Sequence, residues 1–228
     1  MSAVFASLGM SLDGFIAGPN ARPGNPLGDD GLRIHEWVEE AEAWRERQSM
    51  TGGTAGNQDD EIVRETFERA GAYIMGRRMF AEGEVGWPDP PPFRAPVFVL
   101  THTSREPWVR QGGTTFHFVT EGPQAALALA RKAAGGNDVQ VCGGADTVRQ
   151  FLAAGLLEEL EIHLAPIVLG VGTRLFDGAS PDLRLQPVRV AGSPKVTHVA
   201  YRIDSPRTRT RQSGAVQDHE HRKETAGA

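Results

Sequence analysis

The sequence predicts an α/β domain built on a mainly parallel, twisted central sheet with helices on its faces. Short apolar runs alternate with amphipathic segments, which is the pattern of parallel strands joined by crossover helices. The clearest case spans 139–165, where an apolar run, the Gly143-Gly144 pair, a helical segment and a second apolar run follow one another. Beyond it, two strand-like runs at 185–190 and 196–203 predict an antiparallel pair at the C-terminal edge of the sheet.

The first quarter of the chain predicts one buried strand, a loop and a long helix. Residues 3–10 are mostly apolar, as in a strand covered on both faces, and a short apolar piece follows at 15–17. The loop 18–29 is rich in turn-forming residues and is suited to closing over a ligand. Apolar residues recur at helical spacing through 31–48 and predict one amphipathic helix, followed by a glycine-rich stretch at 51–57.

The middle of the chain repeats the alternation of strand and helix. Helices are predicted at 59–70, 76–80, 122–134 and 145–154, and strands at 72–75, 97–100, 116–119, 139–142 and 157–165. Pro123 lies near the start of its helix and glycines follow the ends of the last two, which are common helix boundaries. A proline-rich loop is expected at 87–96.

Composition limits the class of protein. One domain is expected over 1–204, and the polar residues 205–228 are expected to be a disordered tail. A net charge of −5 argues against a nucleic-acid surface, and no apolar run is long enough for a membrane span. The lone cysteine, Cys142, fits a reducing cytoplasm and is expected to be a packed thiol.

Three motifs occur in an order and spacing that resemble a known family. They are Ser-Leu-Asp-Gly-Phe-Ile-Ala at 11–17, a strand ending in Gly-Arg-Arg at 76–78, and Gly-Leu-Leu-Glu-Glu-Leu at 155–160 followed by Ala-Pro and Gly-Val-Gly up to residue 172. Residues 1–204 thereby resemble the dihydrofolate reductase superfamily, especially the reductase domain of the bifunctional riboflavin-biosynthesis deaminase/reductase. The resemblance implies a dihydrofolate reductase-like fold and NADPH as cofactor. The zinc deaminase domain of that enzyme has no counterpart here, and no metal site is predicted.

The start of the helix after the glycine pair is the first expected cofactor contact. A strand running through glycines into a helix leaves free amides that a phosphate can approach, although two glycines can equally make only a tight turn. The expected pyrophosphate contacts are Gly143, Gly144, Ala145, Asp146 and Thr147, with Asp146 as an alternative helix cap. The pattern lacks the third glycine and the acidic residue of a dinucleotide-binding Rossmann fingerprint.

Two further strand ends complete the expected cofactor site. Gly76, Arg77 and Arg78 correspond to the position that, in the resembling enzymes, holds the 2′-phosphate of NADPH; the alternative is a solvated arginine pair. Thr101 and His102 follow the next strand and by the same resemblance flank the adenosine phosphate, with a plain hydrophilic loop as the alternative. An arginine in place of a ribose-binding acid favours NADPH over NADH.

The substrate side is carried by Asp13, Gly170 and Gly172. Asp13 is the expected polar anchor and catalytic residue, and the alternative is that Asp13-Gly14 is simply a turn. The resemblance places Gly170 and Gly172 near the ribose phosphate of the substrate, again with a structural turn as the alternative. His163, central in an apolar strand, is expected to be a hydrogen-bonded sheet residue rather than a base.

These observations predict an NADPH-dependent reductase of a small heterocyclic substrate, with 5-amino-6-(5-phosphoribosylamino)uracil of riboflavin biosynthesis as the named compound. The alternatives are reduction of dihydrofolate, another pterin or an unrelated imine or carbonyl, and a nucleotide-binding protein without turnover. The expected partners are a small-molecule substrate and a second copy of the chain, because the C-terminal strands offer an edge for a homodimer.

Overall fold

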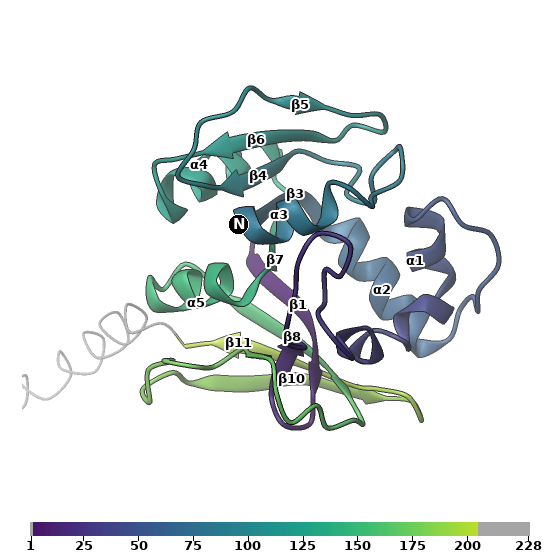
Figure 1. Ribbon diagram of the computed structural model, residues 1–228. Coiled ribbons are helices and arrows are strands. Elements are labelled where there is room, and N and C mark those ends of the chain that lie inside the picture. Colours follow the sequence, from purple (N-terminus) through teal and green to yellow (C-terminus); the bar gives the residue numbers. More distant parts are fainter. Residues whose placement is uncertain (1, 205–228) are drawn as a thin grey trace, which may run out of the picture.

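The computed structural model describes residues 2–204, so the predicted tail at 205–228 lies outside the described residues. Nine strands form one sheet in the order β10-β11-β8-β1-β7-β3-β4-β6-β5, and β2 pairs with β9 in a second, small sheet (Figure 1). The strands are β1 (Val4–Ser11), β2 (Phe15–Ala17), β3 (Ala70–Gly76), β4 (Val97–Leu100), β5 (Trp108–Val109), β6 (Thr115–Val119), β7 (Asp138–Gly143), β8 (Glu159–Ala165), β9 (Thr173–Arg174), β10 (Leu185–Gly192) and β11 (Thr197–Ile203).

The centre of the large sheet is parallel. Strands β8, β1, β7, β3, β4 and β6 run in one direction. Strands β11 and β5 run in the opposite direction at the two sides, and β10 pairs antiparallel with β11 at the outer edge. The predicted fold class is therefore confirmed, including the antiparallel C-terminal pair. Because the carboxyl ends of the parallel strands meet at one edge, the residues that follow β3, β4 and β7 come together there.

Helices cover both faces of the sheet. They are α1 (Glu42–Arg47), α2 (Gln58–Arg69), α3 (Arg77–Gly83), α4 (Pro123–Ala133) and α5 (Ala145–Ala153), with two 3-10 turns, η1 (Gly31–Ile34) and η2 (Val38–Glu40). Alternate residues of β3 show the two faces: Ala72 and Ile74 pack in the cluster that holds α4 and α5, while Tyr73 and Met75 pack with Phe80 of α3. The sheet thus separates two apolar layers.

The predicted helix at 31–48 is wrong, because the chain breaks there into η1, η2 and α1. Ala41 is extended, with ψ 128°, and forms a bridge with Thr54 of the glycine-rich stretch. The Thr54 amide donates to the Glu40 carbonyl at 2.7 Å, and the Glu42 amide donates to the Thr54 carbonyl at 3.3 Å. These bonds take the backbone groups that a continuous helix would use, so a contact from outside the segment ends it.

Two strands have no counterpart among the predicted elements. Strands β5 and β9 are two residues long, which is too short for an alternating apolar pattern. Strand β9 pairs with β2, which holds residues 173 and 174 against residues 15–17. The predicted helix 59–70 also ends one residue earlier, because Ala70 already belongs to β3.

Candidate active site

Two cavities meet at the carboxyl ends of the parallel strands. The inner cavity, about 560 Å³, is lined mainly by apolar residues of β1, β2, α3 and the loop at 21–27. The outer groove, about 500 Å³, runs over the ends of β3, β4 and β7 and the start of α5. Arg78, Met79, Gly144, Ala145 and Thr173 line both, so the two spaces are continuous. An elongated ligand can therefore extend from one into the other.

The glycine pair lies where the two cavities join. Gly143 has φ 130°, a conformation that side chains rarely adopt, and a Cβ on Gly144 would meet no atom within 4 Å. The amides of Thr147 and Val148 donate to the Gly144 carbonyl. No side chain caps the helix, so the alternative role of Asp146 as a helix cap does not apply. The amides of Ala145 and Asp146 precede these bonds and have no backbone acceptor among the described residues. This helix start is open to an anion.

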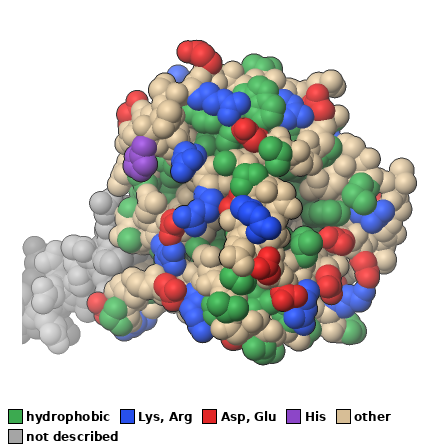
Figure 2. Space-filling model, in the orientation of Figure 1, with side chains coloured by type: hydrophobic (Ala, Val, Ile, Leu, Met, Phe, Trp, Pro, Cys, Tyr) green, Lys and Arg blue, Asp and Glu red, His purple; other side chains and the backbone are tan. Residues whose placement is uncertain are grey.

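Gly76 and Thr147 bring the ends of β3 and α5 into contact. A Cβ on Gly76 would lie 2.4 Å from the Thr147 hydroxyl oxygen, so only glycine allows this approach. Arg77 and Arg78 follow at once, are exposed, and form no hydrogen bond or ion pair with residues 2–204. Figure 2 shows basic side chains gathered on this face over α3 and α5. The groove therefore offers free guanidinium groups beside a helix start.

The structure places nine of the ten predicted cofactor residues along the outer groove. These are Gly76, Arg77, Arg78, Thr101, His102, Gly144, Ala145, Asp146 and Thr147, while Gly143 lines the inner cavity. The Thr101 hydroxyl accepts a hydrogen bond from the Thr103 amide at 3.1 Å, which shapes the turn after β4. His102 is exposed. Residues from three strand ends thus share one wall.

Asp13 and Gly170 lie outside both cavities. The Asp13 carboxylate accepts hydrogen bonds from the Ser11 hydroxyl and from the amides of Leu169 and Gly170, at 2.6, 3.1 and 2.7 Å. These bonds, the Ser11 hydroxyl first, lower the pKa of Asp13 to about 2. Asp13 therefore joins the turn after β1 to residues 169–170. It does not line either cavity, where the sequence predicts it.

Gly172, expected on the substrate side, lines the outer groove where it meets the end of β2. With φ 142°, it lies so close to β2 that a Cβ would stand 2.1 Å from the Ala17 carbonyl oxygen. Its neighbour Thr173 pairs with Ala17 in the small sheet. Gly172 therefore permits the close packing that brings β9 to the junction of the two cavities.

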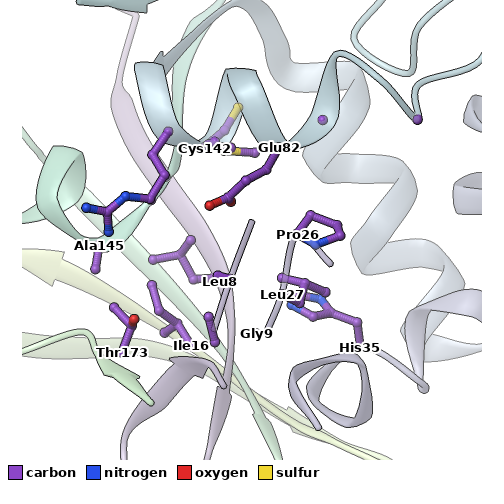
Figure 3. A pocket seen from close by; sticks show the side chains of 18 of the residues that line it. Leu8, Gly9, Ile16, Pro26, Leu27, His35, Glu82, Cys142, Ala145 and Thr173 are labelled. Carbon is purple, nitrogen blue, oxygen red and sulfur yellow. The ribbon is translucent and has the colours of Figure 1, made fainter. Parts of the chain in front are cut away.

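Two ionisable side chains of the inner cavity are not predicted from the sequence. Figure 3 shows the Glu82 carboxylate pointing from α3 into the cavity, with the His35 ring on another wall. Glu82 is 9% exposed, one of its oxygens has no partner, and burial raises its pKa. Enclosure lowers the pKa of His35 to about 4. Glu82 lies one helical turn after Arg78, a spacing that the sequence could have suggested.

Arg149 and Arg174 are further groove residues without a sequence motif. Arg149 on α5 pairs with Asp146 and donates to the Arg174 carbonyl at 3.0 Å. Arg174 in turn donates to the Asp13 carbonyl at 2.7 Å and lies over the Phe15 ring. This chain of contacts fixes part of the groove wall.

Among residues 2–204, no helix is long and apolar enough to cross a membrane. The same part of the chain brings together no group of three histidine, cysteine or carboxylate side chains at metal-binding distances.

The fold and the site define a class: a dihydrofolate reductase-like α/β domain in which a groove lined by arginines and a helix start opens into an apolar cavity. The sequence matches the RibD C-terminal domain over residues 2–199, and the chain belongs to that family. The resemblance found from the motifs is thus confirmed. The uncharacterized protein YwjB of Bacillus subtilis is 32% identical over 69 residues, which cover 30% of this chain and 39% of that protein.

Solved structures share the fold. A pyrimidine reductase-like protein from Corynebacterium diphtheriae is 14% identical, with a TM-score of 0.55 over 90% of this chain and 92% of that one. The deaminase/5-amino-6-(5-phosphoribosylamino)uracil reductase of Thermotoga maritima is 15% identical, with a TM-score of 0.54 over 89% of this chain but only 57% of that one. Dihydrofolate reductase from Enterococcus faecalis, complexed with NADP(H), is 13% identical, with a TM-score of 0.51 over 89% and 97%.

Proposed function

We propose that the chain is an NADPH-dependent reductase of a small heterocycle, with 5-amino-6-(5-phosphoribosylamino)uracil as the first substrate to test. The observation that carries the proposal is the continuity of the two cavities at Gly143 and Gly144. A dinucleotide needs a polar run for its phosphates and an apolar end for its reactive ring, and these two spaces supply both in sequence. The family and the fold support the same class of reaction.

The residues present fit the phosphate end of NADPH. The open front of Gly144 leaves the first amides of α5 accessible, and Arg77 and Arg78 are free to pair with a phosphate. The Asp146 carboxylate, which would repel an anion, is paired with Arg149. NADPH, when bound, supplies a hydride for the reduction of a polarised double bond.

The inner cavity holds the substrate in this proposal. Its apolar walls exclude water, and the partnerless Glu82 oxygen offers a hydrogen-bonding position for a ring nitrogen or an amino group. A heterocycle with N–H groups meets that requirement better than a simple ketone, since a buried carboxyl without a partner is costly.

The homodimer stays a prediction. Its surface would include Val188 and Val190, which are 58% and 68% exposed on β10, and mass measurement in solution tests it.

The cofactor is tested by fluorescence titration of the full chain with NADPH and NADH. In Arg77→Ala, the Kd for NADPH is expected to rise about tenfold or more, because a charge-assisted phosphate contact is lost, while the Kd for NADH changes little. Arg33→Ala is the matched control, since Arg33 is exposed and lies outside both cavities. Equal loss in both variants, or no binding of either nucleotide, would contradict the proposal.

Turnover is tested separately by loss of NADPH absorbance with the riboflavin-pathway pyrimidine. Consumption that depends on the pyrimidine establishes the reductase. Binding of NADPH without turnover of the pyrimidine, dihydrofolate or simple imines would instead support a nucleotide-binding protein without catalysis.

A further inference from the structure

Four hydrogen-bonded side chains lead from the inner cavity into the protein. Ser7 lines the inner cavity, and its hydroxyl lies 2.7 Å from Nε2 of His163. Nδ1 of His163 lies 2.8 Å from Nδ1 of His198, and Nε2 of His198 lies 3.0 Å from the Asp59 carboxylate. Every ring nitrogen of the two histidines is therefore used within the chain of bonds.

The fold holds this arrangement in register. His163 of β8 and His198 of β11 are direct partners across the two strands, and β1 brings Ser7 alongside β8. The Trp37 ring packs on both imidazoles, with centroids 5.0 and 4.9 Å away. His163 and His198 are 7% and 3% exposed, so water does not compete for their nitrogens. The two ends differ, because Ser7 reaches the cavity and Asp59 lies in the first turn of α2.

The surroundings of His163 disfavour the charged form of its ring. Burial, and then the neighbouring His198, His35 and Arg189, lower the pKa of His163 to about 3. A neutral imidazole has one N–H and one acceptor nitrogen, so each ring can receive a proton on one side and release it on the other. With Asp59 ionised, all donors point toward Asp59; with Asp59 protonated, the same bonds reverse and all donors point toward Ser7. The chain can thus hold a proton at either end.

We propose that Ser7, His163, His198 and Asp59 form a proton relay that protonates the substrate in the inner cavity. The inference rests on the proposed reductase function. Reduction of a C=N or C=O bond adds a hydride to carbon, which NADPH supplies, and a proton to nitrogen or oxygen. Ser7 gives its hydroxyl proton to that atom and takes one from Nε2 of His163. His163 is refilled at Nδ1 by His198, His198 at Nε2 by Asp59, and Asp59 by solvent.

The same bonds would also suit a purely structural network, so the test must separate the two roles. Ser7 is the catalytic residue of the proposal, and the other three act through it. A structural network would change stability and substrate binding when broken. A relay changes the rate of the protonation step while the affinities stay the same.

The first experiment measures which histidine nitrogens carry protons, in the absence of turnover. In the full chain labelled with ¹⁵N-histidine, at neutral pH and without cofactor, NMR is expected to find His163 protonated on Nδ1 and His198 on Nε2. Asp59→Asn is expected to shift the nitrogen signals of both rings, because it removes the charge at the end of the chain of bonds. Glu61→Gln removes the same charge from the same turn of α2 at an exposed position and is expected to shift neither. His163 signals unchanged in Asp59→Asn would overturn the relay.

The second experiment measures turnover of the riboflavin-pathway pyrimidine. Ser7→Ala is expected to lower kcat about 100-fold, and Asp59→Asn at least about tenfold, with Ser7→Thr restoring much of the loss. The Kd for NADPH and the KM for the pyrimidine are expected to stay within about threefold, and the solvent isotope effect on kcat is expected to rise. An unchanged kcat in Ser7→Ala, or a loss that appears only in KM, would overturn the proposal.

The two experiments keep the proposals apart. If the parent protein fails to oxidise NADPH with the pyrimidine, the proposed substrate fails, while the NMR result still decides whether the four side chains are coupled. If the parent reduces the pyrimidine but Asp59→Asn leaves the NMR signals of His163 unchanged, the proposed reductase function is supported and the proposed relay is contradicted.

Discussion

At the scale of single residues, the site depends on glycines that let two elements approach. Gly76 is the clearest case, because the Thr147 hydroxyl occupies the space in which a side chain would lie. The motif around Gly76 can be found in the sequence, but its partner Thr147 lies 71 positions along the chain and is brought there by the pairing of β3 with β7. The sequence therefore identifies Gly76 but not the contact with Thr147 that requires a glycine there.

Gly76→Ala is expected to push the end of β3 away from α5. We expect about 1–3 kcal/mol lower free energy of unfolding, from overpacking, together with weaker NADPH binding. Urea unfolding and fluorescence titration measure the two effects. Adding Thr147→Ala removes the clashing oxygen and should recover part of the stability, whereas the absence of any recovery would argue against this contact as the cause.

Glu82→Gln is expected to separate function from stability. Burial raises the pKa of Glu82, so the charged form is disfavoured in the folded state, and a neutral amide of the same shape should raise the free energy of unfolding by about 0.5–2 kcal/mol. Turnover of the pyrimidine should fall, because the carboxyl is lost from the cavity. Thermal unfolding and steady-state kinetics check both results.

Glu84→Gln is the control for that pair of measurements. Glu84 caps the end of α3, pairs with Arg105 at 2.9 Å and lines neither cavity. Its substitution should leave turnover unchanged and cost no more than about 1 kcal/mol. A stability gain equal to that of Glu82→Gln would remove the case for a functional carboxyl.

At the scale of elements, an arginine at the end of α2 ties three strands together. Arg69 forms ion pairs with three carboxylates: Asp138 of β7 at 2.7 Å, and Glu159 and Glu161 of β8 at 2.5 and 3.4 Å. Its guanidinium also lies over the Phe5 ring of β1. Burial raises the pKa of Glu161, which Arg69 opposes. The network thus compensates three carboxylates at one sheet end.

Arg69→Met is expected to lower the free energy of unfolding by about 2–4 kcal/mol, because partly buried carboxylates lose their partner while the aliphatic contact is kept. Urea unfolding measures it. Arg131→Met breaks an exposed pair with Glu158 instead and should cost less than about 1 kcal/mol. Similar costs for the two variants would show that the Arg69 network is only a surface feature.

Most elements could be predicted because their signals are local. The buried strands read as apolar runs, and α4 and α5 follow from their periodicity and boundary residues. The break at Ala41 depends on Thr54, and the pairing of His163 with His198 depends on the register of β8 with β11. Such contacts between distant parts of the chain leave no local pattern, which is why the helix at 31–48 is wrong and the hydrogen-bonded chain behind Ser7 is not predicted.

At the scale of the whole molecule, stability should depend on pH through buried neutral histidines. The pKa of His163 falls to about 3 and that of His35 to about 4, from 6.5 in the unfolded chain. Between these values the unfolded state binds more protons than the folded state, so stability is fully present above pH 6.5 and is lost as pH falls toward 3. Each group contributes a slope of at most about 1.4 kcal/mol per pH unit.

Urea unfolding at a series of pH values from 7.5 to 4.5 is expected to show this decline. His35→Gln should flatten it, since one of the titrating groups is gone, and His102→Gln, at an exposed site in the outer groove, should leave it unchanged. Equal slopes in the parent and His35→Gln would contradict the assignment.

The two edge strands of the large sheet affect whether copies of the chain can associate through backbone hydrogen bonds. At one end, β10 carries Pro187, which has no amide proton to offer, and a bulge between Pro187 and Arg189 interrupts its register. At the other end, β5 is only two residues long. Neither edge presents an unbroken row of backbone groups, which disfavours the addition of a further strand from another copy of the chain.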